Sequence, residues 1–311
     1  MGTRNITSVI MGGKQVVCQY GQWDGYPSWT GTKILEFLRD ADSEQFKRAL
    51  ANTTIKVTDY EHAISYTGST KDYSQFSDII STAKRTLCDL NGKWPDNHDV
   101  FQYLLGQGNH SEDDLENYFV WTRDTGCDVL PLIYYRPLEK SPLELAAMTH
   151  EYQGEYAWDI QGVYVVNLDD RSIQMTFDGY SCQFDMDHLP EDIELTMLVF
   201  EKAAYNLYEY KSHDFADIFS YKEEGDGQKQ LQTLSKDISA RIFEEIKTEY
   251  PDLVLDSKHI ASAEAFGREF LYAQLHEQVE AQKNSLTSKI HAADNKITPF
   301  AAGNMEIAPE L

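Results

Sequence analysis

The first 27 residues constrain the fold of this chain more than any other segment. Residues 3–10 and 14–20 are rich in β-branched side chains and alternate in polarity, and Gly12 and Gly13 lie between them. Two adjacent glycines supply the positive backbone φ that a tight turn between antiparallel strands requires. The pattern therefore predicts a β-hairpin, and the chain is expected to leave the sheet within residues 19–27.

Helical and strand patterns alternate along the chain up to about residue 190. Residues 32–39 and a segment that begins at Ser43 place apolar side chains at helical spacing. Residues 163–168 and 172–177 flank the turn residues 169–170 and predict a second hairpin. These elements indicate that strands and helices share the N-terminal part of the chain.

A further helix is predicted to begin near Ser141 and to end before Gly154. Ser141 is a good N-cap residue, Pro142 suits the first helical position, and Glu144 stands three residues after the cap. Such a combination is typical of a helix N-terminus.

The chain changes character after Pro190, where apolar residues keep helical spacing over residues 231–246 and 258–292. We therefore predict an α+β fold. It comprises an N-terminal α/β sandwich-like domain that contains the hairpin (1–190), an α-helical C-terminal region (191–295) and a tail (296–311).

The charge of the chain restricts its partners. There are 27 basic and 51 acidic residues among 311, a formal net charge of −24. Residues 61–190 hold 8 basic and 22 acidic side chains, and residues 191–311 hold 12 and 23. Such a surface repels nucleic acid and anionic membranes and attracts proteins with basic patches. Direct nucleic-acid binding and membrane association are therefore not expected.

Cysteine usage and hydropathy indicate a cytoplasmic protein. The four cysteines are far apart and lack the spacing of zinc ligands. No signal peptide and no apolar run near 18 residues is found. We therefore expect free thiols, no metal centre and no cofactor.

Motifs for catalysis are missing from the sequence. It contains no G-x-S-x-G nucleophile elbow, no HExxH pair and no phosphate-binding Walker loop, and its nine histidines are scattered. No catalytic residue is therefore predicted.

The segment Gln22–Pro27 is the first candidate site. Trp23 is expected to be partly buried, with its indole N–H near the Asp24 carboxylate. One interpretation is a structural corner that turn residues build. The other is a pocket rim where Trp23 and Tyr26 stack on a ligand and Asp24 accepts its hydrogen bonds.

Arg123 and Asp124 form a second candidate cluster. Adjacent residues of opposite charge do not pair well with each other, so each is expected to find a partner elsewhere, with Asp24 and Arg4 as candidates. If Arg4, Asp24, Arg123 and Asp124 converge, they form a polar cluster that can be tested as a ligand- or partner-binding site.

Several segments resemble a family of small bacterial and phage proteins. Members of that family begin with MGTR and carry YGQWDGYP after a hairpin, as residues 1–4 and 20–27 do here. Residues 119–126 resemble the family's R-D-T-G segment, and residues 158–169 resemble its W…YV(I/V)(D/N)LD strand. The resemblance covers about residues 1–180 and implies a phage or prophage context, not an activity.

Charge, resemblance and the lack of catalytic motifs together favour a non-enzymatic acidic accessory protein of phage or prophage type. Such a protein would bind a host protein with a basic surface in the host cytoplasm, as a candidate inhibitor of a defence or DNA-handling factor.

Two alternatives are kept. The first is an N-terminal-nucleophile-like hydrolase or another small-ligand-binding fold with its pocket at Trp23, Asp24 and Arg123. Removal of Met1 would leave Gly2, which has no nucleophile. The second is a structural protein that forms a homo-oligomer through the 258–292 helix.

Overall fold

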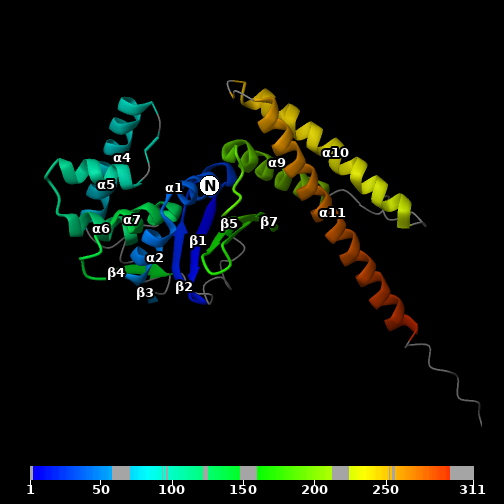
Figure 1. The fold of residues 1–311 in the computed structure, drawn as a ribbon, viewed down its shortest axis with the longest axis horizontal. Coiled ribbons are helices and arrows are strands. Elements are labelled where there is room, and N and C mark those ends of the chain that lie inside the picture. Colours follow the sequence, from blue (N-terminus) through cyan, green and yellow to red (C-terminus); the bar gives the residue numbers. More distant parts are fainter. Residues whose placement is uncertain are drawn as a thin grey trace, which may run out of the picture.

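The computed structural model describes residues 3–57, 71–92, 94–95, 97–121, 125–147, 160–211, 224–251, 253 and 256–294. The chain has a mixed α+β fold with a five-stranded sheet, helices packed beside it and long C-terminal helices (Figure 1). The predicted fold class is confirmed. Within the described ranges, no helix is both long and apolar enough to cross a lipid bilayer.

The central sheet has the strand order β2-β1-β5-β6-β7. Both predicted hairpins are present, and the parallel pairing of β1 with β5 joins them into one sheet. Alternate residues of β5 are buried, as expected for a strand that packs one face on a core. The strands are β1 (Arg4–Met11), β2 (Lys14–Gly21), β5 (Ile160–Asn167), β6 (Ser172–Phe177) and β7 (Tyr180–Asp185).

The tips of the two hairpins are linked. Gly12 and Gly13 have φ values of 62° and 66°, and their N–H groups donate to the two carboxylate oxygens of Asp169 at 2.8 and 2.7 Å. These backbone donors hold the pKa of the Asp169 carboxyl below its usual range. The Asp169 carboxylate therefore has a structural role, because it links the turn of the second hairpin to the turn of the first.

A second, two-stranded sheet corrects one prediction. Leu143–Ala147 is strand β4, not the start of a helix, and it pairs in parallel with β3 (Thr53–Val57). Leu143 and Leu145 are buried while Glu144 between them is exposed, which is a period of two. Pairing with β3 outweighs the local helix signals that precede the strand.

Two segments, each a short helical turn followed by an α-helix, position the candidate site. The chain runs from the π-helical turn η1 (Pro27–Gly31) into α1 (Thr32–Asp40), and from the 3-10 turn η2 (Gly126–Asp128) into α7 (Val129–Tyr135). With α2 (Ser43–Ala51), these helices share an edge-to-face aromatic cluster. The Phe37 ring centroid lies 5.1 Å from that of Phe46 and 5.6 Å from that of Tyr134.

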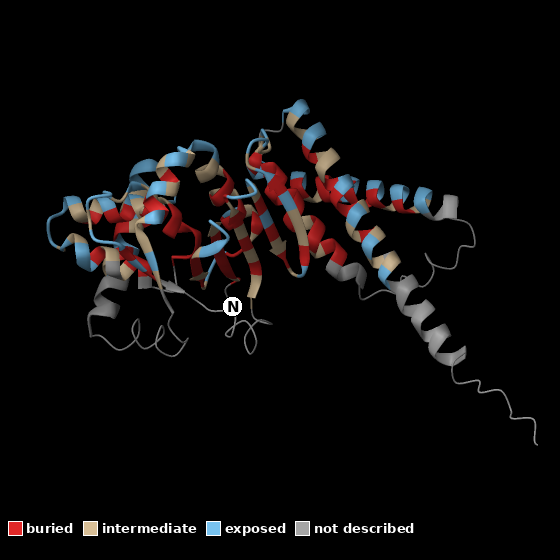
Figure 2. Cartoon of the chain, turned by 60° about the horizontal axis from the view of Figure 1, so that its bottom comes forward, coloured by how far each residue is buried: buried red, intermediate tan, exposed pale blue. Residues whose placement is uncertain are grey.

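Three C-terminal helices belong to the same hydrophobic core as the sheet. These are α9 (Ile193–Lys211), α10 (Glu224–Glu249) and α11 (Ser257–Asp294). One cluster of buried side chains continues from Val9 of β1 through Phe200 of α9 to Leu275 of α11. Figure 2 shows buried residues running from the sheet into these helices. The domain boundary at residue 190 stays a prediction.

Part of the apolar stripe of α11 is buried against other helices of the same chain. Ala263, Phe270, Leu271 and Leu275 are buried, and α11 packs on α9 and α10. The side chains after residue 281 lie outside those whose burial the structure describes. Homo-oligomer formation through residues 258–292 therefore stays a prediction, and the predicted tail at 296–311 lies outside the described residues.

A separate small core lies at the opposite end of the molecule from α10 and α11 (Figure 1). It is built by α4 (Lys71–Asn91), α5 (Asn97–Gly106) and α6 (Glu112–Trp121). Ser111 caps α6, because the Asp114 N–H donates to Ser111 Oγ at 3.2 Å.

Candidate functional site

The Tyr20–Pro27 corner is built around Asn5, whose side chain is buried. Asn5 Nδ2 donates to the Trp23 carbonyl at 3.2 Å. A Cβ atom at Gly21 would lie 2.6 Å from the Asn5 amide, and one at Gly25 would lie 2.8 Å from both Asn5 Cβ and the Thr3 carbonyl. Both glycines are therefore required for close approach to Asn5, not for a positive φ.

The structure places the candidate residues of this corner differently from the expectation. Trp23 is 51% exposed, so its expected partial burial beside Asp24 is wrong. Asp24 is the corner residue with a positive φ, 55°, and its carbonyl accepts a hydrogen bond from Thr30 Oγ1 at 2.7 Å. Tyr26 packs inward, with its ring centroid 6.1 Å from that of Phe177.

The remaining candidates are only partly described. Arg4 begins β1 and pairs with Ile160 of β5. Arg123 and Asp124 lie outside the described residues, so the predicted convergence with Arg4 and Asp24 stays a prediction.

The corner fixes the segment that follows it. Tyr164 is fully buried, and its hydroxyl donates to the Gly25 carbonyl at 2.8 Å. Ser28, at the start of η1, donates from its backbone N–H (3.1 Å) and its hydroxyl (2.5 Å) to the Glu201 carboxylate of α9. These bonds tie Gly25 and Ser28 to the core. They thereby orient the turn η1, which carries Trp29, and the start of α1, which carries Lys33.

A cavity of about 490 Å³ opens beside that turn, and we call it the aromatic pocket. Its walls come from η1 and α1, from η2 and α7, from the connection between α4 and α5 with the first turn of α5, and from the first turn of α9. Its lining includes aromatic and charged side chains, namely Trp29, Lys33, Glu36, Asp40, Trp94, Asp99, Asp128, Tyr134, Tyr135 and Glu194.

Helical spacing explains two walls of the aromatic pocket. Trp29, Lys33, Glu36 and Asp40 recur every three or four residues and therefore share one face of the η1–α1 segment. Asp128, Pro131 and Tyr134 do the same on the η2–α7 segment. The prediction for residues 32–39 rested on their apolar face alone, although the same spacing also reveals the aromatic and charged stripe on the other face.

An ion pair stands on the wall of the aromatic pocket. Lys33 Nζ lies 2.9 Å from Asp128 Oδ1 and 5.0 Å from the centre of the Trp29 ring. Asp128 is 8% exposed, and its second oxygen accepts the Asn97 N–H at 3.3 Å. Asp128 thus holds the Lys33 ammonium against Trp29 and fastens α5 to the same wall.

The pocket holds a cysteine that is not a thiolate at neutral pH. Burial, followed by the neighbouring Asp128 carboxylate, raises the pKa of the Cys127 thiol to about 12. A protonated thiol is a poor nucleophile, so covalent catalysis by Cys127 is not supported.

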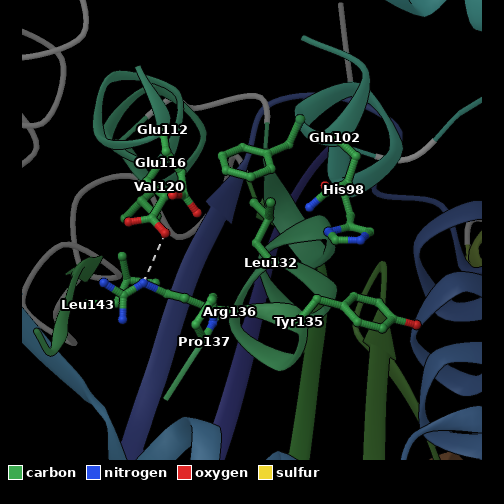
Figure 3. Close-up of a pocket in the computed structure, with 11 residues that line it drawn as sticks. His98, Gln102, Glu112, Glu116, Val120, Leu132, Tyr135, Arg136, Pro137 and Leu143 are labelled. Atoms are coloured by element: carbon green, nitrogen blue, oxygen red, sulfur yellow. Dashed lines mark hydrogen bonds and ion pairs between the residues drawn. The ribbon is translucent and has the colours of Figure 1, made fainter. Parts of the chain in front are cut away.

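A smaller cavity of about 40 Å³ lies next to the aromatic pocket and shares Tyr135 with it (Figure 3). Glu116 faces Arg136 here, with Arg136 Nε 3.1 Å from Glu116 Oε1, and Lys140 Nζ lies 3.0 Å from the same oxygen. The His98 ring stacks on Tyr135 with centroids 4.3 Å apart. The His98 ring packs on Tyr135 from the side of this small cavity, which has room for little more than water.

Comparison of the chain with family models, curated proteins and solved structures finds no match. Over the described ranges, no three His, Cys, Asp or Glu side chains are grouped so as to hold a metal ion. The site is therefore interpreted from its own geometry.

The pH dependence of protein stability tests how Glu201 anchors Ser28, the residue that follows the Tyr20–Pro27 corner. Burial raises the pKa of its carboxyl, while the hydrogen bonds from Ser28 act in the opposite direction. A raised pKa in the folded state means that this group stabilises the protein most at low pH and that its contribution is lost as the pH rises through the folded-state pKa. A Glu201→Gln variant keeps an acceptor for Ser28 but cannot ionise.

We expect the free energy of unfolding of the wild type, relative to Glu201→Gln, to fall as the pH rises above about 4, the ordinary pKa of a glutamate in the unfolded chain. Urea unfolding at a series of pH values measures this difference. Glu201→Ala, which leaves the Ser28 N–H unpaired, should cost about 1–3 kcal/mol at neutral pH. A pH-independent difference between wild type and Glu201→Gln would contradict the assignment.

Proposed function

We propose that this chain is a non-enzymatic binding protein that docks on a protein with a basic surface. The observation that carries the proposal is the charge of the aromatic pocket. Among the lining residues that the structure describes are five carboxylates and one cation, Lys33. The carboxylates are Glu36, Asp40, Asp99, Asp128 and Glu194. Such a surface complements a basic patch and accelerates its encounter with the chain.

Exposed aromatic side chains support docking at the same place. Trp29 is 38% exposed, Trp94 46% and Tyr135 57%. Large aromatic residues that remain accessible inside a cavity are typical anchors of protein–protein interfaces. Carboxylates around them would select a basic partner and orient it.

The resemblance of residues 1–180 to bacterial and phage proteins extends the proposal to the source of the partner. A host protein that handles DNA carries a basic surface, and an acidic accessory protein would compete for it. The Tyr20–Pro27 corner then acts as the support of the docking site, because its bonds orient the turn that carries Trp29 and Lys33.

A charge-reversal experiment tests the docking proposal. The full chain, immobilised on resin, captures proteins from bacterial lysate, and cross-links between chain and prey are located by mass spectrometry. Glu36→Lys combined with Asp40→Lys reverses two charges in the aromatic pocket. The control, Asp237→Lys with Glu269→Lys, makes the same charge change on exposed positions of α10 and α11.

We expect a prey protein that elutes with salt, that cross-links near α1, and that is lost with the pocket variant but kept with the control. The proposal fails if both variants capture the same proteins as the wild type, or if both lose them equally, because binding would then not depend on this pocket.

A further inference from the structure

We propose that the aromatic pocket binds an arginine side chain of a basic peptide segment. This inference rests on the proposed function and makes it specific, because it names the group that enters the pocket. It predicts stacking of a guanidinium on Trp29 or Trp94 and ion pairs with carboxylates of the pocket.

The chain already contains a small example of this recognition. Lys33 places its ammonium 5.0 Å from the centre of the Trp29 ring and 2.9 Å from Asp128. A cation over an aromatic face with a carboxylate beside it is the arrangement by which proteins bind alkylammonium and guanidinium groups. The pocket environment therefore accommodates a positive charge that is partly shielded from water.

More negative charge lines the pocket than Lys33 neutralises. Within the described part of the chain, neither Glu36 nor Glu194 forms an ion pair. The two residues come from α1 and α9, so they face the cavity from different walls. A second cation that enters the pocket would find carboxylate acceptors on more than one side.

Arginine suits these walls better than lysine. Its guanidinium is planar, is weakly hydrated and stacks on indole and phenol rings, and its five N–H donors can reach several carboxylates at once. Trp29, Trp94 and Tyr135 supply exposed aromatic surface around the cavity. The volume of about 490 Å³ also exceeds what one side chain fills, so part of the peptide backbone can enter.

The test uses the full chain labelled with 5-fluorotryptophan and two peptides of equal charge, hexa-arginine and hexa-lysine. The chain has five tryptophans, and single Trp→Phe variants assign their ¹⁹F signals. Trp23 is the internal control, because it is 51% exposed and lies in the corner outside the lining of the pocket.

We expect hexa-arginine to shift the signals of Trp29 and Trp94 but not that of Trp23, and to bind more tightly than hexa-lysine. Trp29→Ala and Trp94→Ala should each weaken hexa-arginine binding about tenfold, whereas Trp23→Ala should leave it unchanged. Trp94 lies in a connecting segment, so its variant tests the pocket even if Trp29→Ala disturbs the η1 turn.

The inference is overturned if hexa-arginine binds without shifting Trp29 and Trp94, if hexa-lysine binds equally well, or if neither peptide binds. Its failure can be told apart from failure of the docking proposal. If Trp29→Ala and Trp94→Ala still capture the lysate partner while the charge-reversal variant does not, docking stands and arginine insertion fails. If charge reversal also leaves capture intact, docking itself fails.

Discussion

A Gly162→Ala substitution is expected to destabilise the protein by about 3–5 kcal/mol. The added Cβ would lie 2.5 Å from the Gly25 carbonyl oxygen and 2.8 Å from the Tyr164 ring. Neither group can move aside, because the oxygen belongs to the backbone of the corner and Tyr164 is fully buried. The substitution therefore separates β5 from the corner and breaks the hydrogen bond between Tyr164 and Gly25.

Urea unfolding of the purified variant measures this loss. Gly106→Ala is the matched control, because a Cβ at Gly106 meets no atom within 4 Å and this residue ends helix α5. It should change the stability by less than about 1 kcal/mol. Tyr164→Phe, which removes only the hydroxyl, should cost about 1–2 kcal/mol. Equal effects of Gly162→Ala and Gly106→Ala would show that the corner does not pack on β5.

Asp128→Ala is expected to cost about 2–3 kcal/mol and to open the aromatic pocket. The change leaves the Lys33 ammonium without its carboxylate and leaves the Asn97 N–H without its acceptor. The full cost of a broken buried ion pair is not reached, because the Lys33 side chain is 25% exposed and can hydrate.

An exposed pair with the same geometry is the control for Asp128. Lys247 Nζ lies 2.9 Å from Glu244 Oε1, and those side chains are 49% and 74% exposed. Glu244→Ala should therefore cost no more than about 0.5 kcal/mol. The double variant Asp128→Ala with Lys33→Met should recover part of the lost stability, because no uncompensated charge remains. Similar losses for Asp128→Ala and Glu244→Ala would contradict the role given to Asp128.

Local signals predicted the hairpins correctly and failed where a distant partner decided the conformation. Gly12 and Gly13 determine their own turn, since a positive φ is a property of the residue. At Ser141 the local signals favour a helix, yet Leu143 donates its N–H to the Asn52 carbonyl at 3.0 Å and continues as a strand. The partner strand lies some 90 residues earlier in the sequence and cannot be inferred from residues 141–144.

The aromatic pocket was not predicted, because none of the candidate residues from the sequence is among its described lining residues. The sequence identified the segment that supports the site, because Trp, Asp and two glycines within five residues mark a corner. It assigned the wrong roles within it, since Trp23 is exposed and the glycines at 21 and 25 make room for Asn5. Contacts between segments that are distant in the sequence leave no local pattern.

The sequence by itself determined the α+β class, both hairpins, the helical C-terminal part and an acidic charge that favours basic partners. The common face of Trp29, Lys33, Glu36 and Asp40 is also encoded locally, because helix periodicity is local, although only the apolar face of residues 32–39 was predicted. Only the tertiary structure brought Asp128, Trp94 and Glu194 to that face and made a pocket of it. The packing of four separate segments against one another decides which charges meet, and that packing depends on the whole fold.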